Sequence, residues 1–67
     1  MIEQNQKYQG LARVREATQF LGLSKSKVYL MMDAGEITYV KIGKCRRIPW
    51  PELRKLVKRN TVPARQS

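Results

Sequence analysis

The sequence predicts a small α+β fold in which two short helices joined by a tight turn are followed by a β-hairpin and a third helix. The chain has 67 residues, and a chain of this length forms one small domain that buries only about 60% of its unfolded surface. Apolar side chains recur at helical spacing in three segments. Between the second and third of these segments, apolar residues alternate with the period of a strand. The order of the segments therefore places the hairpin between the second and third helices.

The first helix is predicted to begin at Val14 and to end near Leu21. Its apolar side chains fall at helical spacing, at Val14, Ala17, Phe20 and Leu21. Gly22 follows directly, and glycine readily adopts the left-handed conformation that closes many helices. We therefore expect a short helix that ends in a tight turn.

The second helix is predicted from Lys25 to about Ala34. Ser24 precedes it as a candidate N-cap, and Gly35 ends it. Its core-facing stripe consists of Val28, Met31 and Met32. Only two or three residues separate the first two helices, and such a helix, glycine-containing turn and helix make the helix-turn-helix pattern.

The stretch "ITYVKIGKCRRI" is predicted to form the hairpin. The pair Gly43-Lys44 suits a two-residue type II′ turn, and the return strand is expected from about Cys45 to Ile48. A third helix follows, with Pro51 in its first turn and its end near Arg59. Its apolar stripe consists of Leu53, Leu56 and Val57, and Trp50 is expected to pack this helix onto the sheet.

The two ends of the chain lack sustained periodicity. Residues 1–10 are mostly polar, and we expect them to form a flexible arm. The tail "NTVPARQS" is polar and interrupted by proline, which is typical of disorder. These boundaries leave residues 11–59 for the folded domain and residues 60–67 for a disordered tail.

The charge of the chain indicates a polyanionic partner. Fourteen Lys and Arg residues stand against five Asp and Glu, which gives a net charge of +9. A small basic body attracts nucleic acid or an acidic membrane surface. No apolar run approaches the roughly 20 residues that span a bilayer, and the first ten residues lack the features of a signal peptide. We therefore expect double-stranded DNA as the partner, no membrane, and a location in the cytoplasm of a prokaryote in association with DNA.

The same composition argues against catalysis and cofactor binding. The chain has no His, and its five carboxylates form no recognisable acid-base constellation. Cys45 is the one cysteine, so neither an intrachain disulfide nor a usual zinc site is expected. We expect a binding protein that is not an enzyme, with no metal, no cofactor and no small-molecule substrate.

The second helix carries the first set of candidate DNA contacts. With its apolar stripe facing the core, the opposite face presents Ser26, Tyr29, Leu30 and Asp33. The N-terminal residues of a recognition helix reach base edges and phosphates in the major groove, and a helix N-terminus is itself an anion site. The candidate residues are Ser24, Lys25, Ser26, Lys27, Tyr29 and Leu30. The alternatives are a capped, solvated helix start and, for Tyr29, a ring that leans on the scaffold.

The hairpin carries the second set. Four cations fall within seven residues, at Lys41, Lys44, Arg46 and Arg47. A narrow basic tip can lie along a DNA backbone or enter a minor groove. The alternative is a device that prevents edge-to-edge pairing of strands. Two basic elements in this order favour DNA binding.

The stretch "VREATQFLGLSKSKVYLMMDAGEITYVKIGKCRRIPWPEL" resembles the excisionase-type DNA-binding domain. This family is a small winged helix-turn-helix related to the DNA-binding part of MerR-type regulators. The resemblance covers about Leu11 to Val57. It places Lys25, Ser26, Lys27 and Tyr29 on the recognition helix and Lys44, Arg46 and Arg47 in the wing, as the family names its hairpin.

The resemblance implies an accessory factor of phage or mobile-element recombination. Such a recombination directionality factor binds and bends attachment-site DNA so that an integrase favours excision. Leu30 and Asp33 stand where family members often carry basic residues, and Arg13 stands where a Ser or Thr cap is common. Leu30 can contact a thymine methyl group or serve as a surface for a partner, so the base preference stays open, and the first helix is expected to be poorly capped.

Two other functions remain open at this point. One is a small transcriptional regulator of the same fold, and the other is a basic module that docks an acidic protein. A domain of this size reads only a few base pairs, which is too few for specific binding by one copy. We therefore expect a monomer in solution that associates with other copies on DNA.

Overall fold

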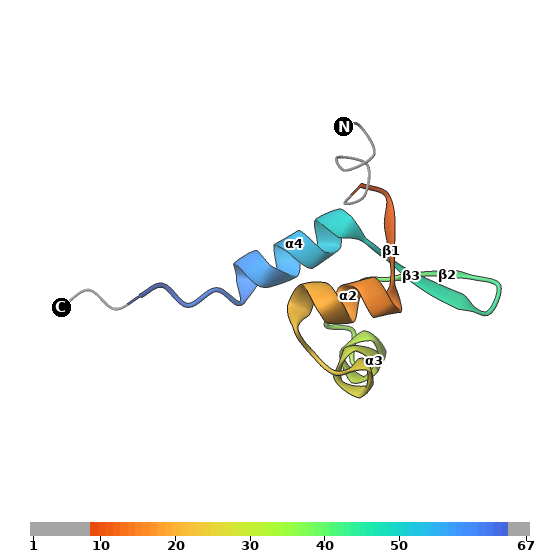
Figure 1. The fold of residues 1–67 in the computed structure, drawn as a ribbon, viewed down its shortest axis with the longest axis horizontal. Coiled ribbons are helices and arrows are strands. Elements are labelled where there is room, and N and C mark those ends of the chain that lie inside the picture. The colour runs from red at the N-terminus through yellow and green to blue at the C-terminus, as the bar shows by residue number, and fades with distance from the viewer. Residues whose placement is uncertain (1–8, 65–67) are drawn as a thin grey trace.

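The computed structural model describes residues 9–64, and the predicted arm lies almost wholly outside them. Within this range the fold consists of three helices and one three-stranded sheet (Figure 1). In chain order the elements are β1 (Leu11–Arg13), α2 (Val14–Leu21), α3 (Lys25–Asp33), β2 (Val40–Ile42), β3 (Cys45–Pro49) and α4 (Trp50–Arg59). The predicted helices and hairpin are all present, which confirms the small α+β winged helix-turn-helix fold.

The sheet has one strand more than the sequence predicted. Its order is β1-β3-β2, and both pairs are antiparallel. β1 pairs with the second half of β3, where Ala12 lies opposite Ile48. The backbone N–H of Trp50 donates to the carbonyl oxygen of Gly10 at 3.0 Å and extends this pairing. The expected two-stranded hairpin is therefore one edge of a three-stranded sheet, because three residues of β1 are too few to show a period of two.

The core lies between the helices and one face of the sheet. The largest completely buried side chains are Ile48, Leu53 and Val28, so the centre of the core joins β3, α4 and α3. The buried apolar residues are Ala12, Val14, Ala17, Val28, Met32, Ile37, Ile48, Trp50, Leu53 and Leu56. This confirms the predicted burial of Trp50. Phe20 was predicted to face the core but is 42% exposed, because it sits at the margin and contacts Trp50 edge-on, with ring centroids 5.5 Å apart.

The turn between α2 and α3 forms as predicted. Gly22 has a φ of 69°, and its N–H and that of Leu23 both donate to the carbonyl oxygen of Thr18, at 2.8 and 3.1 Å. Ser24 then caps α3, since its Oγ accepts from the N–H of Lys27 at 3.1 Å. These local contacts fix how α3 leaves the turn.

The start of α2 is capped from inside the helix. Arg13 occupies the N-cap position before the helix. Its side chain has no hydrogen-bond acceptor, so it cannot cap the helix, as the sequence predicted. The carboxylate of Glu16 compensates, because its Oε1 accepts from the backbone N–H of Arg13 at 2.8 Å. Half of a capping box therefore replaces the absent Ser or Thr.

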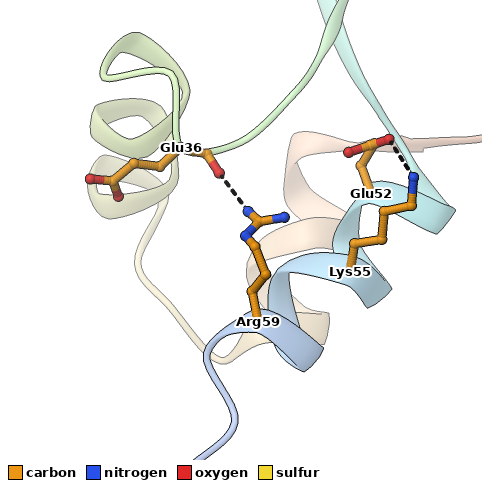
Figure 2. Close-up of polar contacts among 4 residues, drawn as sticks. All are labelled: Glu36, Glu52, Lys55 and Arg59. Carbon is orange, nitrogen blue, oxygen red and sulfur yellow. Dashed lines mark hydrogen bonds and ion pairs between the residues drawn. The ribbon is translucent and has the colours of Figure 1, made fainter.

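A contact from α4 holds the segment that follows α3. Figure 2 shows Arg59 reaching from the end of α4, where its Nη2 donates to the carbonyl oxygen of Glu36 at 3.3 Å. On the same helix, Lys55 and Glu52 form an ion pair with 3.6 Å between Nζ and Oε2. The C-terminal end of α3 is thus tied to α4, while its N-terminal end is tied to the turn after α2.

Candidate nucleic-acid interface

An open cleft of about 510 Å³ separates the helix-turn-helix from the hairpin. Five of its nine lining residues are cationic, and α2, α3 and the hairpin all contribute at least one of them. These cations are Arg15, Lys25, Lys44, Arg46 and Arg47, and the remaining lining residues are Val14, Thr18, Tyr29 and Cys45. The described residues of the lining include no carboxylate. The cleft therefore offers a concentrated positive field to an anionic chain.

The N-terminal turn of α3 adds to this field. No acidic residue lies in its first turn, so nothing there offsets the partial positive charge of the helix terminus. Lys25 at this end lines the cleft. Backbone amides and an ammonium group so placed are suited to phosphate oxygens.

The predicted residues of α3 divide into two groups. Lys25 and Tyr29 border the cleft. The others do not line it and are exposed on the surface of the helix, with Leu30 reaching 66% exposure. This second group is Ser24, Ser26, Lys27 and Leu30. These residues form the exposed outer face of α3, which can enter a groove of DNA. The cleft beside this face can accommodate the DNA backbone.

Tyr29 is less exposed than the helical wheel indicated. It is half-buried and packs against the core, so the ring leans on the scaffold as the alternative interpretation allowed. One side of the residue still borders the cleft.

The predicted hairpin cations also divide. Lys41 and Lys44 are exposed, whereas Arg46 and Arg47 are half-buried. Gly43 has a φ of 60°, which the first position of the predicted type II′ turn requires, and this turn presents Lys44 at the tip. Lys41 pairs with Arg46 across the strands but does not line the cleft.

Arg46 is engaged by groups of the protein itself. Its Nη1 lies 3.1 Å from Oδ1 of Asp33. Its guanidinium carbon lies 4.7 Å from the ring centroid of Tyr39 and 5.1 Å from that of Tyr29. Both distances fall within the range of cation–π attraction. Arg46 therefore differs from the other cleft cations, although the sequence placed it among them.

Arg15 is a cleft residue that the sequence did not single out. It lies on the exposed side of α2, and the spacing of the apolar residues already predicts this exposure. Nothing local indicates that this side meets the hairpin, because that depends on how the sheet closes against the helices. The presence of Arg15 in the cleft is a consequence of tertiary structure.

Two other features were sought in the described part of the chain, metal-ligand groups and membrane-spanning helices. Residues 9–64 contain no group of three or more His, Cys, Asp or Glu side chains able to hold a metal ion. Within the same residues, no helix has both the length and the apolar character needed to cross a membrane.

The fold and the basic cleft define a winged helix-turn-helix protein. The family model described as a helix-turn-helix domain matches residues 13–61, and the chain belongs to this family. It is similar to a protein of Saccharopolyspora erythraea named "Probable excisionase", with 49% identity over 39 residues. That match covers 58% of this chain and 40% of the relative, so the chain accounts for less than half of the relative's length. No solved structure matches the chain. The predicted resemblance is thus confirmed at the level of the family: the chain is a helix-turn-helix protein that is similar to an excisionase.

Proposed function

We propose that the protein is a recombination directionality factor, which binds and bends attachment-site DNA and so promotes integrase-mediated excision in a prokaryotic cell. The observation that carries this proposal is the cationic cleft between the N-terminus of α3 and the hairpin. The name of the relative supports the recombination role.

In the proposed complex, α3 enters the major groove. Its exposed outer face, with Ser26, Lys27 and Leu30, then meets base edges. Leu30 offers an apolar side chain that suits a thymine methyl group. Specificity comes from this face, because the hydroxyl, ammonium and apolar groups differ in the base edges that they favour.

The cleft takes the phosphate backbone beside that groove. Arg15 and Lys25 approach the backbone from the helices, and Lys44 and Arg47 approach it from the hairpin. Contacts with phosphates fix the position of a protein on the duplex and carry little sequence information. The cleft therefore sets affinity and register, and the outer face of α3 sets preference.

In the proposed complex, α3 and the hairpin contact the same side of the duplex, and this arrangement favours bending of the DNA toward the protein. Curving the DNA toward the protein brings more phosphates within reach of the hairpin cations of the cleft, Lys44 and Arg47. Smooth bending of a 20–30 bp site costs on the order of 1–6 kcal/mol, and a few charge-assisted hydrogen bonds of about 1.5–3 kcal/mol each offset it. A bend is thus within the capacity of several bound copies.

The test combines footprinting with recombination. Full-length protein is added to DNA from around its own gene, and the protected region and the bend angle are measured by footprinting and by energy transfer between end labels. Purified integrase encoded on the same element is then assayed for excision with and without the protein. We expect protection near the attachment site, a bend, and faster excision. Protection of a promoter alone, with excision unchanged, would instead identify a transcriptional regulator.

A further inference from the structure

We propose that Arg46 is a positioning residue that locks the wing (residues 40–49) against the recognition helix α3, and that it does not bind DNA. The inference goes beyond the proposed function and uses DNA affinity only as one of two readouts.

The guanidinium of Arg46 links three separate segments. Tyr29 belongs to α3, Tyr39 precedes β2, and Arg46 itself lies in β3. The two rings lie 5.1 and 4.7 Å from the guanidinium carbon, and both tyrosines also pack against the core. A planar guanidinium stacks on aromatic faces in a way that an ammonium group does not. The hairpin is thereby attached to the scaffold through side chains that are themselves held.

Asp33 completes this arrangement from the last residue of α3. A carboxylate at a helix C-terminus is unfavourable beside the negative end of the dipole, and the nearby cation of Arg46 offsets it. The side chain of Asp33 is 62% exposed and that of Arg46 is 24% exposed. Because an exposed ion pair contributes little by itself, the two rings supply the greater part of the attachment.

The burial of Arg46 limits what else it can bind. Its Nη1 is inaccessible to solvent and makes no aligned hydrogen bond, although Oδ1 of Asp33 lies 3.1 Å away. A phosphate oxygen cannot reach this nitrogen without displacing the pair. The charge of Arg46 is also offset by Asp33, so its contribution to counterion release is small.

The sheet shows why the wing needs such an attachment. β1 pairs with β3 at Arg47, Ile48 and Pro49, whereas β2 pairs with β3 at Cys45, Arg46 and Arg47. Beyond Arg47 the wing is therefore a two-stranded ribbon, and an isolated two-stranded hairpin is marginally stable in water. Arg46 is the first residue past the third strand. It fixes the ribbon at the point where backbone pairing with β1 stops.

The test compares Arg46→Met with Arg46→Lys and with Lys44→Met as the matched control. Lys44→Met removes one charge from the exposed wing tip. For each full-length variant, DNA affinity is measured from low to moderate salt, and wing order is measured from the ¹⁵N relaxation of residues 40–45 without DNA.

For Arg46→Met we expect about tenfold weaker binding, an unchanged salt slope and a more mobile wing. Arg46→Lys should restore less than half of the lost affinity, since lysine keeps the charge but lacks the planar guanidinium group that stacks on the tyrosine rings. For Lys44→Met we expect an ordered wing and a slope shallower by about 0.9, the value for one phosphate.

Three results would overturn the proposal. A slope shallower by about 0.9 in Arg46→Met, with the wing still ordered, would make Arg46 a phosphate contact. Unchanged affinity of the folded variant, with only a lower melting temperature, would reduce its role to stability. Full recovery of affinity in Arg46→Lys would show that the charge alone holds the wing and that stacking on the rings of Tyr29 and Tyr39 is not required.

If the protein bound no DNA at all, the proposed function would fail, while the relaxation data would still test the attachment of the wing to α3. If Arg46→Met did not fold, Tyr39→Leu would test the same link.

Discussion

Salt should weaken DNA binding, and the number of cleft cations that neutralise phosphates should determine how steeply the affinity falls. Four of its cations are available for phosphates once Arg46 is assigned to the scaffold, namely Arg15, Lys25, Lys44 and Arg47. Each neutralised phosphate contributes about −0.9 to the slope of log K against log salt, so the slope should be roughly −3.6. Raising salt from about 50 to about 200 mM would then weaken binding about 150-fold.

The variant Lys25→Met tests whether this slope belongs to the cleft. Removal of one phosphate contact should give a slope of about −2.7, and the same rise in salt should then cost only about 40-fold. Lys58→Met is the control, because Lys58 is exposed on α4 and does not line the cleft. It changes the net charge equally and should leave the slope near −3.6.

Fluorescence anisotropy on a labelled duplex from around the gene provides the measurement. Equal slopes for Lys25→Met and Lys58→Met would refute the reasoning, since binding would then follow net charge alone. A slope near zero for the unmodified protein would remove DNA as the main partner.

Three further predictions concern the scaffold and the assembly on DNA. Leu53→Ala, at a completely buried position, should lower the free energy of unfolding, measured by urea denaturation, by about 2–5 kcal/mol. A decrease of less than about 1 kcal/mol would contradict the central place of Leu53 in the core. Ser24→Ala removes the Oγ that accepts from Lys27 and should cost about 1 kcal/mol, to be read from thermal unfolding, whereas Ser26→Ala, its control on the same helix, should leave the melting temperature nearly unchanged. Sedimentation without DNA should give a monomer of 7.8 kDa, and titration onto a fragment with several sites should be sigmoidal; a tight dimer without DNA would argue against cooperative assembly.

The sequence predicted those parts of the fold that depend on local signals. The turn between α2 and α3 needs only Gly22 in its left-handed conformation and Ser24 as a cap, and both are visible within a few residues. The hairpin turn at Gly43 and the buried positions Leu53 and Leu56 of α4 are local in the same sense, and these elements formed where they were expected. Val57, predicted as part of the same stripe, is 45% exposed.

The remaining features depend on contacts between distant segments. β1 has three residues, and only its partner in β3 makes it a strand. Arg46 was grouped with the wing cations because sequence shows its charge, whereas its contacts with Tyr29 and Tyr39 arise from the tertiary structure. Arg15 was passed over for the converse reason, since its side of α2 meets the hairpin only in the folded protein.

The pairing of β1 with β3 also has a consequence for folding kinetics. It joins positions 12 and 48 of the chain, whereas the helix-turn-helix and the hairpin are closed by contacts between near neighbours. Closing a long loop costs more chain entropy than closing a short one, and long-range contacts slow folding. The β1 edge should accordingly form late, after the two local units have ordered. In pulse-labelling hydrogen exchange during refolding, the amide of Trp50, bonded to Gly10, should therefore gain protection no earlier than the amides between β2 and β3.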